Sequence, residues 1–215
     1  AEVQEVLLEE RCLNTSVGQI EFDKLVIAMG ADTNYFGNIQ LEQNAFPMKS
    51  VQESLGLRNH LLRCIERALV TEDEADRKSI LSVVIVGGGP TGTEVAGAIS
   101  EMKRFVLPKD FPNLDFSEMN IYLLEAGPHL LNGMRDKSSK AAERFLKEMG
   151  VSVMTNAMVE SYDGEVIKIK GGDEIRTQNL IWAAGVKGNA LNGIPKEMYV
   201  ANSRIKVNQF NQLDG

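Results

Sequence analysis

The stretch SVVIVGGGPTGTEVAGAI, residues 82–99, decides the fold. A short apolar run leads into Gly87-x-Gly89-x-x-Gly92, and apolar residues at helical spacing follow at once. The glycine pattern alone is a weak signal, but between a strand and a helix it is typical of a dinucleotide-binding turn. Gly87 then permits the tight turn, Gly89 lets the backbone approach a pyrophosphate, and Gly92 lets helix and strand pack closely. The alternative interpretation is a glycine turn with a purely structural role.

Strands and helices alternate on either side of this turn. The predicted elements are a strand at 80–86, a helix at 91–104, a Pro-rich excursion at 107–120, a strand at 121–124, a helix at 137–149 and a strand at 151–154. This β-α-β-α-β order predicts an α/β domain of Rossmann type, with a parallel sheet and right-handed crossovers.

The pattern changes after the third strand. Residues 159–162 and 166–170 are typical of a hairpin around Asp163-Gly164, for which we expect a type I′ turn, and Gly171-Gly172 leads to a third short strand. Residues 180–183 then return as a buried strand. A Rossmann half whose third crossover is a β-meander is the arrangement of the two-dinucleotide flavoprotein reductases.

The first 47 residues predict part of a second domain. Residues 3–29 are expected to form a β-hairpin or meander, followed by a buried strand at 25–28 that Gly30 ends. Residues 31–47 contain many turn formers and little periodicity, so we expect a connecting loop.

A long amphipathic helix is predicted to follow. Ser50 and Glu53 have the spacing of a capping box, and we expect the helix to end near Val70. Its apolar face is predicted to be Val51, Leu55, Leu62, Ile65 and Leu69. The charged residues 71–78 are expected to be a solvated linker.

Glu125 ends the second strand of the predicted sheet, where a carboxylate can accept hydrogen bonds from an adenosine ribose. It lies 38 residues after Gly87 (125 minus 87), further than the usual spacing of about 20. The insertion at 107–120 accounts for the excess. The alternative interpretation is a surface glutamate at a strand end.

Glu94 allows two interpretations. Thr91 and Glu94 have the spacing of a capping box at the start of the helix, which would make Glu94 a structural residue. A carboxylate beside a phosphate-binding loop could instead face the nicotinamide and help to position it against a flavin. Residue chemistry alone favours the first interpretation.

Composition excludes some other functions. The formal net charge is -7 and the sequence pI is about 5.0, so the chain is a poor partner for nucleic acid. Cys12 and Cys64 lie far apart and match no metal-ligand spacing, and we expect no metal site. His60 and His129 belong to no recognisable triad, and Trp182 is expected in the core. The absence of a signal peptide or long apolar span in the sequence predicts a cytoplasmic chain.

Four segments together resemble the type II NADH dehydrogenases, a family within the FAD-dependent pyridine nucleotide-disulfide oxidoreductase superfamily. They are GGGPTGTEVAGAI, FDKLVIAMGADTNYFG, MKSVQESLGLRNHLL and LIWAAGVKGN. The resemblance implies non-covalent FAD, reduction by NADH through hydride transfer to the flavin, reoxidation by a membrane quinone, and a parent protein peripheral on the cytoplasmic face of the inner membrane. It leaves the oligomeric state open, a homodimer included.

The resemblance also assigns roles by motif position. Glu94 would be the carboxylate near the nicotinamide and Glu125 the ribose acid, while Gly30 would lie near FAD. The dinucleotide loop would be Gly87, Gly88, Gly89, Pro90, Thr91 and Gly92. The turn Ala184, Gly185 and Val186 would approach the nicotinamide.

The sequence departs from the family pattern in ways that predict an internal fragment. Met29 stands where the family usually has threonine, and an N-terminal FAD-binding glycine motif, a later acidic FAD motif and the C-terminal membrane segment are missing. We expect residues 1–47 to be a partial FAD-domain segment, 48–186 the NADH-binding domain and 187–215 a return segment. NADH recognition should then be retained without the complete reaction.

Three alternatives remain at this point. A disulfide reductase of thioredoxin-reductase type would need a C-x-x-C motif in this domain, and the sequence has none, whereas a cysteine pair further upstream would not be seen here. A ferredoxin or nitrite reductase flavoprotein has the same fold. A non-catalytic NADH-binding sensor would share the glycine loop.

Overall fold

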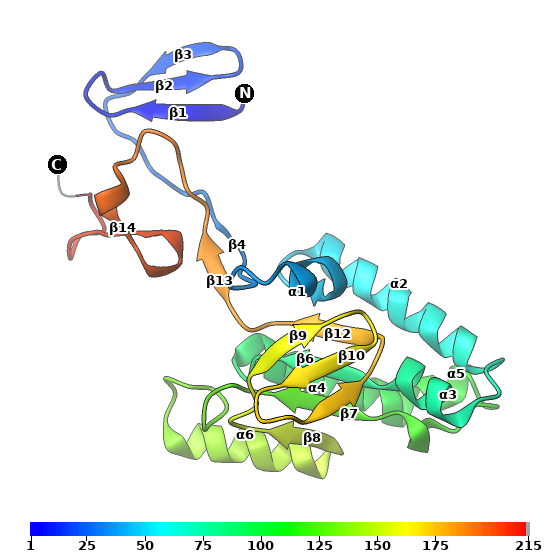
Figure 1. Ribbon diagram of the computed structural model, residues 1–215. Helices are drawn as coiled ribbons and strands as arrows, with labels where there is room; N and C mark the ends of the chain where they lie inside the picture. The colour runs from blue at the N-terminus through cyan, green and yellow to red at the C-terminus, as the bar shows by residue number, and fades with distance from the viewer. Residues whose placement is uncertain (214–215) are drawn as a thin grey trace. The chain divides into compact units, whose positions relative to one another are not determined.

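The computed structural model describes residues 1–213, and the chain divides into two compact units (Figure 1). Unit 1 consists of Ala1–Asn34 and Val186–Gly215, and unit 2 of Tyr35–Gly185. Residues 35–47, which the sequence analysis groups with the FAD-domain segment, lie in unit 2.

Unit 2 is built on a five-stranded parallel sheet with the strand order β5-β12-β6-β7-β8. Its strands are β5 (Phe46–Pro47), β6 (Val83–Val86), β7 (Ile121–Leu124), β8 (Val151–Met154) and β12 (Asn179–Trp182). Ile85 of β6 is in register with Ile181 of β12 and Leu123 of β7. The predicted parallel sheet is confirmed, and β7 and β8 have the predicted bounds.

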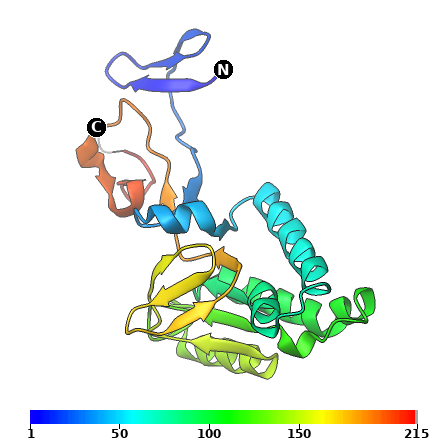
Figure 2. The same ribbon diagram turned by 45° about the vertical axis from the view of Figure 1, so that its right-hand side comes forward.

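Both faces of this sheet are covered, which explains why its central strands are apolar throughout. Val83 and Ile85 pack among the helices, whereas Val84 and Val86 pack against a meander on the other face (Figures 1 and 2). The meander is β9 (Val159–Tyr162), β10 (Val166–Ile169) and β11 (Glu174–Arg176), with α1 (Ile39–Asn44) beside β9. The predicted meander crossover is therefore confirmed.

The helical layer begins with α2 (Val51–Ala68). Its capping box is confirmed, because Ser50 Oγ accepts from the N–H of Glu53 and Glu53 Oε2 accepts from the N–H of Ser50. The predicted packing face is wrong at Val51, which is 79% exposed, and at Leu55 and Leu69, which are also exposed. Two apolar stripes run along the helix, and periodicity does not say which one packs. The buried stripe is Leu57, Cys64, Ile65 and Ala68.

The predicted linker at 71–78 is wrong in its second half, because α3 (Glu74–Leu81) begins there. Asp73 caps this helix by accepting from the N–H of Asp76 over 2.8 Å, and acids in the first turn favour its dipole. Ile80 and Leu81 are buried residues of this helix. The strand before the glycine turn therefore starts at Val83 instead of the predicted residue 80. The charged cluster is thus the outer face of a helix.

The helix after the glycine turn is α4 (Pro90–Glu101), and it continues as a π-helical turn, η1 (Met102–Val106). The excursion at 107–120 contains α5 (Leu107–Asp110) and η2 (Phe116–Glu118), in place of irregular chain alone. Leu107 and Phe116 are buried in the main core, which anchors both short helices. The last helix, α6 (Asp136–Glu148), lies close to its predicted bounds.

Two further turn predictions need correction. The loop predicted at 31–47 contains β4 (Ala31–Thr33), α1 and β5. The hairpin at Asp163-Gly164 has no type I′ turn, because that turn needs positive φ at both residues and only Gly164 has it, at +104°. The Asp163 carboxylate instead accepts from the N–H groups of Glu165 and Val166.

Unit 1 contains the predicted N-terminal meander, β1 (Val3–Leu7), β2 (Cys12–Thr15) and β3 (Gly18–Glu21). A two-stranded ribbon pairs β4 with β13 (Val186–Gly188), and β14 (Tyr199–Val200) pairs with β15 (Arg204–Ile205). Val6 forms a small core with Leu191 and Ile194. Gly193 passes so close to β1 that a Cβ there would lie 1.9 Å from Val6 O.

The buried strand predicted at 25–28 is wrong. Those residues form no strand, and Val26 is 86% exposed. A buried strand needs hydrogen-bonding neighbours, and within the described residues no strand pairs with this segment.

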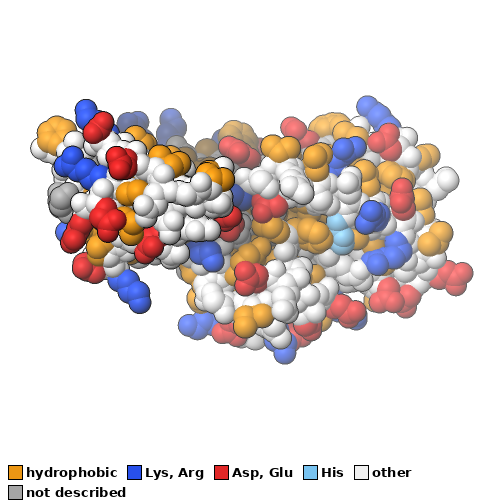
Figure 3. All heavy atoms as spheres, turned by 90° about the horizontal axis from the view of Figure 1, so that it is seen from above, with side chains coloured by type: hydrophobic (Ala, Val, Ile, Leu, Met, Phe, Trp, Pro, Cys, Tyr) orange, Lys and Arg blue, Asp and Glu red, His pale blue; other side chains and the backbone are white. Residues whose placement is uncertain are grey.

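The surface carries both signs of charge. Acidic and basic side chains are interspersed with hydrophobic ones over the face seen in Figure 3, and neither sign forms a continuous field there. None of the helices within residues 1–213 is both long and apolar enough to cross a membrane.

Candidate dinucleotide-binding site

The predicted site residues of unit 2 meet at the carboxyl edge of the parallel sheet. Gly87 follows β6, Glu125 follows β7, and Ala183 follows β12. Open α/β sheets bind ligands in the crevice outside the carboxyl ends of their strands. This edge is therefore the candidate site.

Glycine is required at positions 87 and 92, because neighbouring backbone atoms lie too close for a side chain. Gly87 has a φ of +111°, and a Cβ there would lie 2.6 Å from Ala183 O. A Cβ on Gly92 would lie 1.8 Å from Gly87 O. The first glycine thus lets the loop pass beside the chain after β12, and the last one lets α4 close against the loop.

Gly89 differs from both, because a Cβ at this position would meet no protein atom within 4 Å. Its open side faces away from the packed loop, which leaves room for a ligand to approach the backbone. Gly89 is also the N-cap of α4, and no side chain caps the helix. The N–H groups of the first turn, at Thr91 and Gly92, have no intrahelical acceptor and can bind a phosphate.

Gly88 is held by residues that follow β7. Its N–H donates to Glu125 Oε2 over 2.6 Å, and its carbonyl accepts from the N–H of Leu131 over 2.7 Å. A Cβ at Gly88 would lie 2.5 Å from Cδ2 of the fully buried Leu130. The sequence analysis did not predict a role for Leu130 and Leu131. A signal was present, because these two leucines and the turn at Gly127 follow the acid at the end of a strand, close to the glycine loop.

Both oxygens of the half-buried Glu125 carboxylate accept backbone hydrogen bonds. Oε2 accepts from Gly88, as described, and Oε1 accepts from the N–H of Gly127 over 2.7 Å. Each carboxylate oxygen offers about two acceptor sites, so capacity for ribose hydroxyls remains.

The capping-box interpretation of Glu94 is wrong. Since the N-cap of α4 is Gly89, Thr91 lies inside the helix and Glu94 is its fifth residue, two positions after the place of a capping-box acid. Within the described part of the chain, no hydrogen bond or ion pair involves the Glu94 side chain, which is exposed.

The predicted turn Ala184, Gly185 and Val186 begins at the site. Ala183 N–H donates to Val86 O, and the Cα of Ala184 would lie 2.7 Å from a Cβ on Gly87. Gly185 is the last residue of unit 2, whereas Val186 is the first residue of β13 in unit 1. Only the first two residues of the turn therefore belong to the sheet edge in unit 2.

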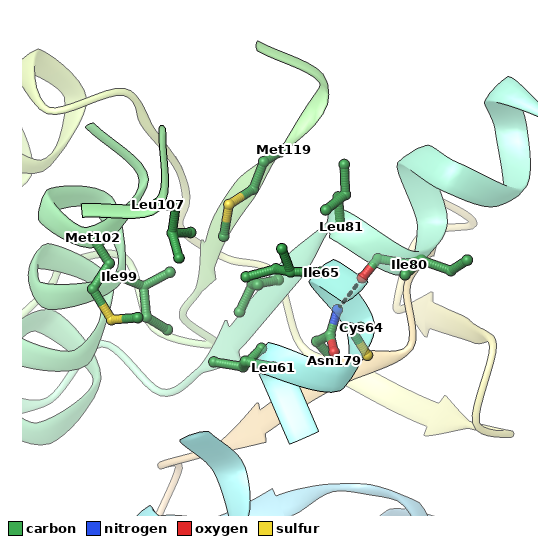
Figure 4. Close-up of a pocket in the computed structure, with 11 residues that line it drawn as sticks. Leu61, Cys64, Ile65, Ile80, Leu81, Ile99, Met102, Leu107, Met119 and Asn179 are labelled. Atoms are coloured by element: carbon green, nitrogen blue, oxygen red, sulfur yellow. Dashed lines mark hydrogen bonds between the residues drawn. The ribbon is translucent and has the colours of Figure 1, made fainter. Parts of the chain in front are cut away.

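Gly30 lies in unit 1, with a φ of +70°, and lines an open groove of about 1060 Å³. Segments 24–31 and 203–207 form much of its wall, together with Val186, Gly188 and Asn189. Its lining is largely apolar, and its volume matches that of a small-molecule site. A second cavity, in the core of unit 2, holds only about 20 Å³ and is lined by side chains such as Leu61, Ile99 and Met119 (Figure 4). That volume admits one water molecule at most.

The other candidate residues are structural. Trp182 is buried as predicted and stacks on Tyr35, with ring centroids 5.9 Å apart. His60 Nε2 lies 2.9 Å from Asn179 Oδ1 and 3.4 Å from Cys64 Sγ, and burial raises the pKa of the Cys64 thiol. Across residues 1–213, no group of three or more His, Cys, Asp or Glu side chains could hold a metal ion.

The sheet, the meander crossover and the glycine turn at the carboxyl edge define a Rossmann-type α/β domain of the flavoprotein reductase class. The family model for pyridine nucleotide-disulphide oxidoreductases matches residues 2–214. The chain belongs to this family.

Similar proteins agree with the predicted resemblance. The chain is 41% identical over 174 residues to the type II NADH:quinone oxidoreductase NdhA of Mycobacterium tuberculosis, covering 79% of this chain and 37% of that protein. A second type II NADH:quinone oxidoreductase of the same organism, Ndh, is 34% identical over 177 residues, covering 80% of this chain and 38% of that protein. The chain thus spans well under half the length of these relatives.

Among solved structures, NDH2 from Plasmodium falciparum in complex with RYL-552 superposes with a TM-score of 0.82 at 25% identity, covering 88% of this chain and 41% of that one. A ferredoxin reductase from Rhodopseudomonas palustris shares the fold, with a TM-score of 0.64 at 16% identity over 86% of this chain and 40% of that one.

Proposed function

We propose that this chain provides the NADH-binding part of an FAD-dependent NADH dehydrogenase that passes electrons to a quinone. The observation that carries the proposal is the loop Gly87–Gly92 at the sheet edge, open at Gly89 and bonded to a strand-end acid at Gly88. The similarity to two type II NADH:quinone oxidoreductases supports a quinone as the electron acceptor.

Each part of NADH has a proposed contact. The pyrophosphate would bind at Gly89 and the first turn of α4, where Pro90 sets the helix start and the N–H of Thr91 is free of an intrahelical acceptor. The ribose hydroxyls would donate to Glu125. The nicotinamide would lie toward Ala184 and Gly185, with Glu94 orienting it. In this proposal unit 2, residues 35–185, forms the NADH-binding domain, and the two segments of unit 1 belong to the FAD domain.

The groove of unit 1 fits part of a flavin. It combines apolar walls with Gly30, which has a positive φ and where an added Cβ would have no atom of residues 1–213 within 4 Å. Bound FAD supplies the two-electron acceptor for the NADH hydride. The residues of this chain would bind the dinucleotide, fix the direction of its nicotinamide and exclude water by packing.

The cellular setting is part of the same proposal. The whole protein would act on the surface of a membrane, on its cytoplasmic face, and a homodimer is compatible with it. The same fold also occurs in ferredoxin reductases, but the named relatives with 30% identity or more favour a quinone over a ferredoxin.

Two measurements test the function. Isothermal titration of this chain with NADH should show one site per chain, and no detectable binding would refute the assignment of unit 2. In the whole protein, NADH oxidation should depend on added quinone. Transfer to a ferredoxin or to a disulfide substrate would support the other reductases of this fold, and NADH binding without turnover would support a sensor.

A further inference from the structure

We propose that Glu125 is a positioning residue for the phosphate-binding loop, acting through Gly88, in addition to its contact with the ribose. The inference rests on the proposed function and deepens it, because it joins two parts of the same site. Its consequence is that nucleotide preference and pyrophosphate affinity depend on one side chain.

The carboxylate of Glu125 connects two loops. One oxygen accepts from Gly88, in the loop after β6, over 2.6 Å, and the other accepts from Gly127, in the turn after β7, over 2.7 Å. Hydrogen bonds to an ionised acceptor are about twice as strong as those between neutral groups. The side chain therefore cannot be removed without releasing the N–H of Gly88.

The segment after β7 also contacts the carbonyl and the Cα of Gly88. Its carbonyl accepts from the N–H of Leu131 over 2.7 Å, and its Cα packs against Leu130. Leu131 itself has a φ of +52°, a conformation that costs energy in a leucine and persists only where the surroundings impose it. Residues 125–131 thus determine the orientation of the Gly88 peptide.

That orientation matters for phosphate because Gly88 directly precedes Gly89, the N-cap of α4. A fixed Gly88 aims the following N–H groups before the ligand arrives, and such preorganisation raises affinity by reducing the ordering cost of binding. Glu125 would therefore contribute to binding even for a nucleotide that offers it no hydroxyl.

The test uses an NADH analogue that lacks both hydroxyls of the adenosine ribose. Glu125→Gln replaces one acceptor oxygen by a donor group, so one of the two backbone N–H groups loses its partner. A hydrogen bond to a charged group contributes enough that we expect the variant to bind the analogue at least about tenfold more weakly than the unmodified chain does. Equal affinity of the unmodified chain, Glu125→Gln and Glu125→Ala for the analogue would overturn the positioning role and leave Glu125 as a ribose ligand alone.

Amide hydrogen exchange gives a readout that needs no nucleotide. The N–H of Gly88 should exchange faster in Glu125→Ala, which removes both acceptor oxygens, and the N–H of either Gly88 or Gly127 should exchange faster in Glu125→Gln. Amides of β6 and β12 should keep their rates. Glu160→Gln is the matched control, because Glu160 is exposed in the same unit and its carboxylate contacts no donor within residues 1–213. Unchanged exchange at Gly88 in Glu125→Ala would overturn the proposal.

A second variant guards against misfolding. Glu125→Asp keeps the charge but is one methylene shorter, so it should not reach both donors, and the same losses are expected. If the unmodified chain is folded by circular dichroism but binds neither NADH nor the analogue, the proposed function is overturned, and the positioning role with it. That result is distinct from equal binding by the variants.

Discussion

The N–H of Gly88 and the carboxylate of Glu125 are joined by a hydrogen bond of 2.6 Å between the ends of two neighbouring strands. Position 88 is the first variable position of the pattern G-x-G-x-x-G, where sequence alone permits any residue. In this chain the position also requires glycine, because Leu130 and Glu125 occupy the space of a side chain.

Gly92→Ala and Gly89→Ala should separate folding from binding. The Gly92→Ala methyl would lie 1.8 Å from Gly87 O, and overpacking of this kind costs roughly 1–3 kcal/mol or more. The Gly89→Ala methyl meets no protein atom, so that variant should keep its stability but lose NADH affinity. Urea unfolding and calorimetric titration measure the two effects. Normal NADH binding by Gly89→Ala would show that the pyrophosphate does not approach there.

Glu94→Gln should slow flavin reduction in the whole protein without changing stability. Glu94 is the fifth residue of α4 and does not cap the helix, so the substitution removes no capping hydrogen bond. The amide keeps the size of the side chain, so only the charge is lost. Stopped-flow reduction by NADH, with thermal unfolding as the control, measures both. Reduction at the unmodified rate would contradict a role at the nicotinamide.

The Arg77 and Glu118 pair should make stability depend on pH. Arg77 Nε and Nη2 donate to the two oxygens of Glu118 over 2.7 and 2.9 Å. The hydrogen bond from Arg77 lowers the pKa of the Glu118 carboxyl below its ordinary value. The stabilisation is therefore fully present above the unfolded pKa of about 4.3 and is lost as the pH falls through the lower folded pKa.

Glu118→Gln tests this dependence. Urea unfolding between neutral pH and the acid limit of the folded chain should show a shallower loss of stability in the variant. Glu160→Gln again provides a control with the same change of charge. An identical pH dependence in all three proteins would mean that the pair contributes nothing measurable.

Local signals predicted much of the fold. β7 and β8 have their predicted bounds because each is an apolar run between turn formers, and Ser50 with Glu53 marks the start of α2. What could not be predicted depends on distant partners. The packing face of α2 depends on which of two stripes meets the sheet, and residues 25–28 form no strand without a neighbour. The bond from Gly88 to Glu125 links residues 37 apart.

The chain should prefer NADH to NADPH, because in the proposed site Glu125 lies where a 2′-phosphate would bind. A phosphate there would face a carboxylate and would lose the hydrogen bonds that ribose hydroxyls donate. The structure strengthens the argument, since backbone bonds from Gly88 and Gly127 prevent the carboxylate from turning away.

Calorimetric titration at neutral pH should place NADH ahead by at least about tenfold, which corresponds to ~1.4 kcal/mol. Glu125→Ala should reduce this ratio and, because Gly88 is released, should also weaken binding of both nucleotides. Equal affinities in the unmodified chain, or a preference that persists in full in Glu125→Ala, would show that another residue discriminates between the two nucleotides.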